Sequence, residues 1–171
     1  MRELFNLDMK NYDINGPKFV RPSVRGIIIH NGKIAMVHSL KHDYYKFPGG
    51  GLESGESNHE ALIREVKEES GLTVIPESVK EYGLVRRIEA GRKNEIFYQE
   101  NLYYLCETED YTVEQELDDY EADENFTLEW VSPEEAIAAN RKPDHGPKSP
   151  IMIEREAKVL EILIEEGYFT C

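Results

Sequence analysis

Three glutamates, Glu65, Glu68 and Glu69, are spaced so that their side chains would share one face of a single helical turn. Like charges at this spacing repel one another by roughly a few tenths of a kcal/mol per exposed pair. Leu62 and Val66 lie on the other side of the same turn, so the helix would pack into a core and present its acidic face outward. Mg²⁺ prefers oxygen ligands and would relieve the repulsion. The spacing indicates a magnesium site, with a solvated acidic face as the alternative.

A glycine-rich turn leads into this helix. Residues 48–51 read Pro-Gly-Gly-Gly, and glycine lets the backbone approach a ligand closely. The helix N-terminus that follows favours anions. Arg64 has three possible partners: Glu60 or Glu68 at a spacing of one helical turn, or Glu56 if the loop folds back. Any of these pairs would order this part of the chain.

These residues together resemble the signature of the Nudix hydrolases. Gly50 is followed after five residues by Glu56, and after seven more by the run Arg64-Glu-Val-Lys-Glu-Glu-Ser-Gly-Leu72. Every fixed position of the signature is filled at its spacing. The resemblance covers residues 20–140, including Glu129–Ala136 near its end. No match is claimed for the N-terminal extension or the last helix.

The resemblance implies an α/β fold of the layered α+β kind, with a mixed β-sheet sandwiched between helices. It also implies a loop–helix–loop whose carboxylates bind Mg²⁺ or Mn²⁺. Carried onto this sequence, Glu65, Glu68 and Glu69 would be metal ligands, and Gly50 would add its backbone carbonyl. The reaction would be attack of water on phosphorus in a diphosphate linkage, which divalent ions assist by neutralising charge and acidifying bound water.

Two further roles follow from the resemblance. Glu56 and Arg64 would form the ion pair that shapes the loop. The general base would come either from the box helix or from a later segment, which leaves five candidates: Glu65, Glu68, Glu100, Glu121 and Glu124.

Basic residues near the expected cleft are candidates for binding substrate phosphates. Arg86 and Arg87 begin a basic cluster that continues at Arg92, and Arg25 and Lys46 stand on strands before the box. An acidic protein with a polyphosphate substrate needs such donors, because charge-assisted hydrogen bonds are the strong contacts to phosphate.

The rest of the chain predicts one domain over residues 21–171, ending in a helix, after an extension over 1–20 that adds an edge strand. Asn31-Gly32 between two β-rich runs is typical of a hairpin. Ser57 with Glu60 forms a capping box, and Gly71 is a natural helix end. The expected strands are 24–30, 33–38, 44–47, 73–87, 96–106 and 126–131, and the expected helices are 58–70, one from Pro133, and 151–167.

The net charge of −14 is concentrated in one stretch. Residues 107–124 hold ten acids and no base, which predicts a solvated mobile loop, or a flap that brings the catalytic base to the substrate. A surface this acidic repels nucleic acid. No apolar run reaches the roughly 20 residues needed to span a membrane. Two distant cysteines, Cys106 and Cys171, indicate a reducing cytoplasm.

The sequence therefore predicts a hydrolase of a small, nucleotide-like diphosphate, with no nucleic-acid or membrane partner; a homodimer is left open. The alternative is a non-catalytic Nudix-like module that binds nucleotides. An isopentenyl-diphosphate isomerase is disfavoured because no cysteine precedes the box. The family's markers for ADP-ribose and dinucleoside polyphosphates, a proline and a tyrosine past the box, are replaced by Ile88 and Ala90. The substrate stays open among nucleoside triphosphates, nucleotide sugars and these two classes.

Overall fold

A computed structural model describes residues 1–170, so Cys171 lies outside the described residues. The strands are β1 Glu3–Asp8, β2 Lys18–Ile27, β3 Ile29–His30, β4 Lys33–Ser39, β5 Tyr44–Lys46, β6 Gly49–Gly51, β7 Leu72–Val74, β8 Lys80–Ala90, β9 Ile96–Leu105, β10 Thr108–Thr112 and β11 Phe126–Val131. The helices are α1 Asn58–Ser70, α2 Asp119–Asp123, α3 Pro133–Asn140 and α4 Pro150–Glu165, with a 3₁₀ turn at Pro76–Ser78.

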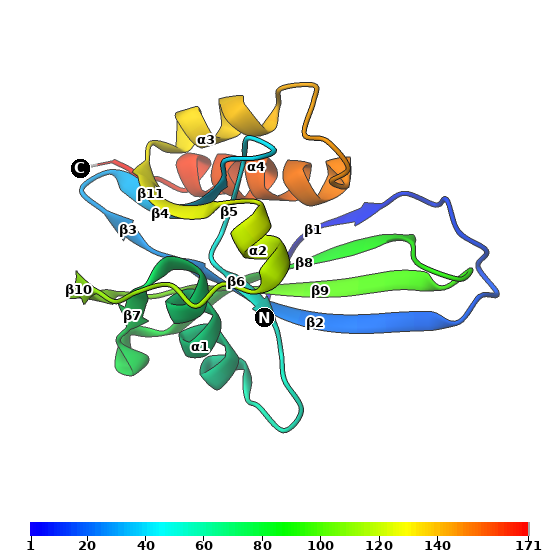
Figure 1. Cartoon of the computed structure of the whole chain (residues 1–171), viewed down its shortest axis with the longest axis horizontal. Coiled ribbons are helices and arrows are strands. Elements are labelled where there is room, and N and C mark those ends of the chain that lie inside the picture. The colour runs from blue at the N-terminus through cyan, green and yellow to red at the C-terminus, as the bar shows by residue number, and fades with distance from the viewer. Residues whose placement is uncertain (171) are drawn as a thin grey trace.

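The main sheet is mixed and has the strand order β1-β8-β9-β2-β6. β1 pairs in parallel with β8, and β2 in parallel with β9, whereas β8 and β9 form an antiparallel hairpin. α1 lies on one side of this sheet, and α3 and α4 lie on the other (Figure 1). The predicted fold class, a mixed sheet between helices, is confirmed. β1, β2, β8 and β9 extend beyond the helices as a long arm (Figure 1).

The alternation of residues along β9 fills two cores on opposite faces of the sheet. Tyr103 is buried in the cluster on the α4 side, with Leu160. Tyr104 is buried in the cluster on the α1 side, with Leu62 and Val66. The helix carrying the signature is therefore held by one face of β9, while the last helix is held by the other.

The hairpin at Asn31-Gly32 forms as predicted, but it is shorter than expected. Asn31 and Gly32 both have positive φ, 51° and 73°, as a tight hairpin turn requires. Only β3 pairs with β4 across this turn. Residues 24–27 instead belong to β2 and pair with β6 and β9 in the main sheet. The second sheet is completed by β11 and β5, which both pair with β4.

The acidic stretch contains secondary structure and is bonded to the rest of the fold, so the prediction of a loop over residues 107–124 is wrong. It contains β10, which pairs with β7, and the short helix α2. The Val113 and Glu116 amides donate to the carbonyls of Gly71 and Glu68, each at 2.8 Å. Gln115 donates from its side-chain amide to the Glu69 carbonyl. These bonds fasten the stretch to the C-terminal end of α1.

No helix within residues 1–170 is long and apolar enough to cross a membrane.

Candidate active site

Local sequence signals fix the position of α1. The Ser57 hydroxyl accepts from the Glu60 amide at 3.2 Å, and the Glu60 carboxylate accepts from the Ser57 amide at 2.8 Å. Gly71, with φ 75°, ends the helix. Leu62 and Val66 are fully buried beneath it. The glutamates at 65, 68 and 69 are therefore held in register with the glycine loop.

Arg64 joins the loop to the helix. Its Nε and Nη2 atoms lie 2.6 and 2.9 Å from the two carboxylate oxygens of Glu56, and Nη2 also donates to the Gly51 carbonyl at 3.2 Å. Its Nη1 lies 2.9 Å from Glu65 and 3.1 Å from Glu68. The hydrogen bonds from Arg64 lower the pKa of Glu56 to about 2. One guanidinium thus orders the loop and neutralises part of the acidic face.

Glu69 faces a different environment from its neighbours. It is 1% exposed, and it accepts from the Gly49 amide at 3.0 Å and from Lys46 Nζ at 2.5 Å. Lys46 also donates to the Gly49 carbonyl at 3.1 Å. Burial raises the pKa of Glu69 to about 7, against the opposing effect of Lys46. Glu69 and Lys46 together pin the glycine loop against α1.

The donor chemistry around Gly50 fits a hard divalent cation. A Cβ on Gly50 would lie 2.5 Å from Glu65 Oε2, so only glycine lets this carboxylate reach the loop backbone. Every donor here is oxygen, as Mg²⁺ prefers. As placed, no three His, Cys, Asp or Glu side chains within residues 1–170 converge on one metal position. Arg64 and Lys46 hold the carboxylates instead.

A cavity of about 470 Å³ opens beside these residues and contains Gly50, Glu65 and Glu69 in its wall. Seven basic side chains also line it: Arg21, Arg25, Lys46, Arg87, Arg92, Lys148 and Arg155. The structure therefore brings three of the four basic residues predicted to bind substrate, Arg25, Lys46 and Arg87, to the same space as three of the four predicted metal ligands, all but Glu68.

Arg86 and Glu100 lie away from this cavity. They alternate with Arg87 and Gln99, which line it, so their side chains leave the opposite face of the sheet. There Arg86 lies 2.8 Å from Glu3 and 3.4 Å from Glu100. Their placement on the arm's other face argues against roles in substrate binding and proton transfer.

The two base candidates in the acidic stretch differ in whether they line the cavity. Glu121 lines the cavity, where its oxygens accept from the Asp118 amide at 2.9 Å and the Tyr120 hydroxyl at 3.1 Å. Glu124 does not line it and is 5% exposed. Its oxygens accept from Ser39, Tyr44 and Lys148. Those hydrogen bonds keep the pKa of Glu124 below its usual value despite burial, which acts to raise it.

Arg155 is a cavity residue that the sequence analysis missed. It is 1% exposed and comes from the buried face of α4. Its Nη1 donates to Gln99 at 3.1 Å and its Nη2 to Glu156 at 2.8 Å, while its Nε has no hydrogen-bond partner among the described residues. The available signal was a charged pair, Arg155-Glu156, within the apolar stripe of an amphipathic helix, where a charge needs a reason to be buried.

The fold and the site define a layered α/β protein in which a carboxylate-bearing helix and a glycine loop border an arginine-rich cavity. The chain belongs to the NUDIX domain family, whose model matches residues 20–153. The predicted family is therefore confirmed.

Solved structures share this fold. A NUDIX hydrolase from Nitrosomonas europaea matches with a TM-score of 0.60 and 19% identity, over 88% of this chain and 89% of that one. MutT from Aliivibrio salmonicida and Vibrio cholerae matches with a TM-score of 0.55 and 21% identity, over 86% and 99%. At these identities the likeness describes the fold alone.

Curated relatives match a shorter segment. An RNA pyrophosphohydrolase of Hahella chejuensis is 45% identical over 62 residues, which is 35% of this chain and 37% of the relative. One of Halorhodospira halophila is 42% identical over 69 residues, or 39% and 36%. The match thus spans little more than a third of each relative's length. Because these relatives are named for RNA, the expectation that nucleic acid is not a partner is not supported by the comparison.

Proposed function

We propose that this protein is a divalent-metal-dependent hydrolase that cleaves a diphosphate linkage in a phosphorylated nucleoside. The observation that carries the proposal is one cavity that is lined by Gly50, Glu65 and Glu69 together with seven basic side chains. In a chain with a net charge of −14, such a concentration of Arg and Lys is suited to a polyanion. Membership of the NUDIX family and the names of the curated relatives support the same reaction.

Some of these residues would bind the metal ion and others the substrate. Glu65, Glu68 and the Gly50 carbonyl would hold the ion, with Glu69 reaching it only by exchanging its Lys46 contact for the metal. When bound, Mg²⁺ or Mn²⁺ supplies charge neutralisation and a water of lowered pKa. Arg25, which is buried and donates to the Gly49 carbonyl at 3.0 Å, would hold a phosphate beside the loop.

We propose Glu121 as the general base among the acids of the later segment, with Glu65 and Glu68 as alternatives in the box. Glu121 lines the cavity together with its neighbours Asp118 and Tyr120. Both of its oxygens accept hydrogen bonds, which holds the carboxylate in one orientation. A base must lie within reach of the attacking water, and this position satisfies that requirement better than Glu100 or Glu124.

The substrate candidates are a free nucleotide and the 5′-triphosphate end of an RNA. The acidic surface favours the free nucleotide, because RNA binding rests on many cation–phosphate contacts. The second candidate is retained because the curated relatives are named RNA pyrophosphohydrolases. Both share a nucleoside linked to a diphosphate, which is the chemistry that the cavity fits.

The test is a panel of compounds assayed with Mg²⁺ or Mn²⁺, with products identified by mass. The panel contains nucleoside triphosphates, nucleotide sugars, ADP-ribose, dinucleoside polyphosphates and a 5′-triphosphorylated oligonucleotide. Release of a nucleoside monophosphate, phosphate or diphosphate that stops in EDTA is expected. If no compound is cleaved but nucleotides bind, the protein is a non-catalytic binding module instead.

A further inference from the structure

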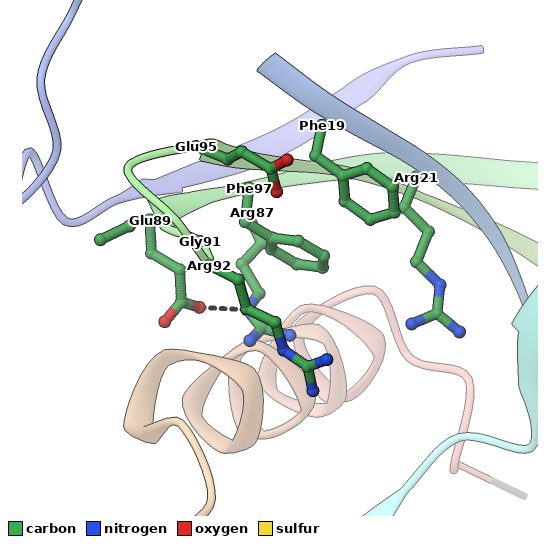
Figure 2. Close-up of a pocket in the computed structure, with 9 residues that line it drawn as sticks. Phe19, Arg21, Arg87, Glu89, Gly91, Arg92, Glu95 and Phe97 are labelled. Carbon is green, nitrogen blue, oxygen red and sulfur yellow. Dashed lines mark hydrogen bonds and ion pairs between the residues drawn. The ribbon is translucent and has the colours of Figure 1, made fainter. Parts of the chain in front are cut away.

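A second cavity, of about 680 Å³, lies beside the catalytic one and reaches the turn between β8 and β9 at the outer end of the strand arm. Arg21, Arg87, Arg92 and Phe97 line both cavities. In Figure 2 two aromatic rings lie beneath the strands, and the guanidinium groups project from the same region toward α4. Because the two cavities adjoin, one ligand can occupy both.

The aromatic rings belong to Phe19 and Phe97, which face each other across neighbouring strands. They occupy partner positions in the parallel β2–β9 pairing, and their ring centroids are 6.2 Å apart with planes inclined by 29°. Phe19 is 50% exposed. Two nearly parallel rings at the surface form a continuous apolar platform, which is the kind of surface on which nucleobases stack.

The cations around this platform differ in how they are paired. Arg87 lies with its guanidinium 5.0 Å from the centre of the Phe97 ring and pairs with Glu89, which in turn accepts from the Ser149 hydroxyl at 3.0 Å. Within residues 1–170, Arg21 and Arg92 have no ion pair and no side-chain hydrogen bond. The lining stays net positive, with three arginines against Glu89 and Glu95, and two guanidiniums without an ion pair beside an aromatic platform suit a ligand that is both anionic and aromatic.

We propose that this second cavity binds the nucleoside monophosphate portion of the substrate. The base stacks on Phe19 and Phe97, and the phosphate of the monophosphate is held by Arg21 and Arg92. The inference rests on the proposed function and names the part of the substrate that lies outside the metal site. The scissile linkage joins this phosphate to the next one, which then extends past Arg87 into the catalytic cavity.

The lining also sets the selectivity of the subsite. Its lining residues, all in the described part of the chain, include no amide or hydroxyl side chain, so arginines and glutamates are the polar side chains beside the base. Stacking depends on the face of the base and not on its identity. The subsite is therefore expected to bind by stacking, and to bind purines more tightly than pyrimidines because their stacking area is larger.

The test measures binding of adenosine 5′-monophosphate by calorimetry in EDTA, which removes hydrolysis from the measurement. Phe19→Leu and Arg21→Gln are compared with matched controls, Val20→Ala and Lys18→Gln. The controls make similar changes on the same strand, but at positions that alternate with Phe19 and Arg21; Lys18 lies over the Tyr98 ring on the other face. Arg92→Gln provides an independent variant outside the strand, and thermal melting confirms that each variant folds.

Each of the three subsite variants is expected to weaken binding at least about fivefold, as loss of one stacking or charged contact does, while the controls bind as the unsubstituted protein does. Adenosine and inorganic phosphate should each bind more weakly than the monophosphate. Tighter binding of a 5′-monophosphorylated oligonucleotide than of adenosine 5′-monophosphate would indicate an RNA end as the ligand, and weaker binding would indicate a free nucleotide.

The two proposals fail separately. Equal binding by the subsite variants and the controls, or no binding by the unsubstituted protein, would overturn the subsite even if diphosphates are hydrolysed. Variant-sensitive binding without hydrolysis of any panel compound would overturn the proposed function and leave the subsite standing. If Phe19→Leu changes only the oligomeric state, the aromatic platform is a contact between copies of the chain, and the subsite is wrong.

Discussion

Adjacent glutamates in the box occupy opposite environments. Glu68 keeps 34% of its side chain exposed, whereas Glu69 keeps 1%. Glu68 shares Arg64 with Glu65 across a solvated surface. Glu69 is enclosed with Lys46 and the Gly49 amide. The same substitution at these two positions therefore removes the same charge but disturbs the fold to different extents.

We predict that Glu68→Gln and Glu69→Gln each lower kcat at least about 100-fold, because a metal ligand is worth several kcal/mol of transition-state stabilisation. Their stabilities should differ. In EDTA, Glu68→Gln leaves the melting temperature unchanged or slightly raised, since repulsion along the helix falls. Glu69→Gln lowers it, because Lys46 loses a buried partner. Glu77→Gln, at an exposed position, is the control; near-normal turnover in both box variants would refute the metal-ligand assignment.

Arg64 is predicted to act by ordering the loop. Arg64→Ala should lower both the melting temperature and kcat, because it removes every bond that ties Glu56 and the Gly51 carbonyl to α1. Arg64→Lys should restore part of the stability and less of the activity, since an ammonium cannot reproduce the bidentate contact. Melting curves and steady-state kinetics measure both effects. A stable but inactive Arg64→Ala would mean that Arg64 touches the substrate.

Elements with local signals, including the strand 126–131, were predictable from the sequence, whereas the partners of the strands were not. The signals for the start, the end and the buried face of α1 all lie within residues 57–71, and the helix forms as predicted. The residues 24–27 read equally well as a strand of either sheet, because alternation does not specify the partner. β10 was missed because its charged sequence lacks a strand pattern and only its pairing with β7 orders it.

The candidate site divides in the same way. The box residues could be named because their spacing is local to one helix and one loop. Arg155 could not, because its place in the cavity depends on how α4 packs across β9, where it meets Gln99. Arg86 and Arg87 could not be told apart without the register of β8, which turns one toward the cavity and the other away from it.

The acidic segment between β10 and β11 supplies a test of the base. Glu121→Gln should lower kcat at least about 100-fold, as loss of a general base does, with little change in stability because glutamine also serves in a capping box. Glu124→Gln should lower the melting temperature, because it weakens a buried cluster with Lys148 and Tyr44, and it should retain more activity. Kinetics and melting of both variants measure this; full turnover in Glu121→Gln would return the base to the box.

At the scale of the whole molecule, charge is unevenly distributed. The acids of residues 107–124 account for ten of the net fourteen negative charges, while seven of the 20 Lys and Arg side chains line the two cavities. A polyphosphate would be repelled by most of the surface and attracted at one opening. Such a molecule also carries many ion-paired carboxylates, so its stability must respond to acid.

Asp43, remote from the box, makes the acid response testable. Hydrogen bonds from Lys142 and then His38 hold the pKa of Asp43 below its usual value. A carboxyl whose pKa is lowered by folding adds stability above its unfolded pKa of about 4, and this stability is lost as pH falls through the lower folded value. Asp43→Asn removes the charge and tolerates the positive φ of 50° at this position.

We therefore predict that Asp43→Asn unfolds more readily than the unsubstituted protein at pH 7, and that the difference closes below about pH 4, where the unfolded carboxyl is protonated. Urea unfolding at a series of pH values measures the difference directly. Asp110→Asn, an exposed acid of β10, makes the same change in net charge and should show no such closing difference. A gap for Asp43→Asn that is constant from pH 7 down to acid unfolding would mean that Lys142 and His38 contribute nothing through its charge.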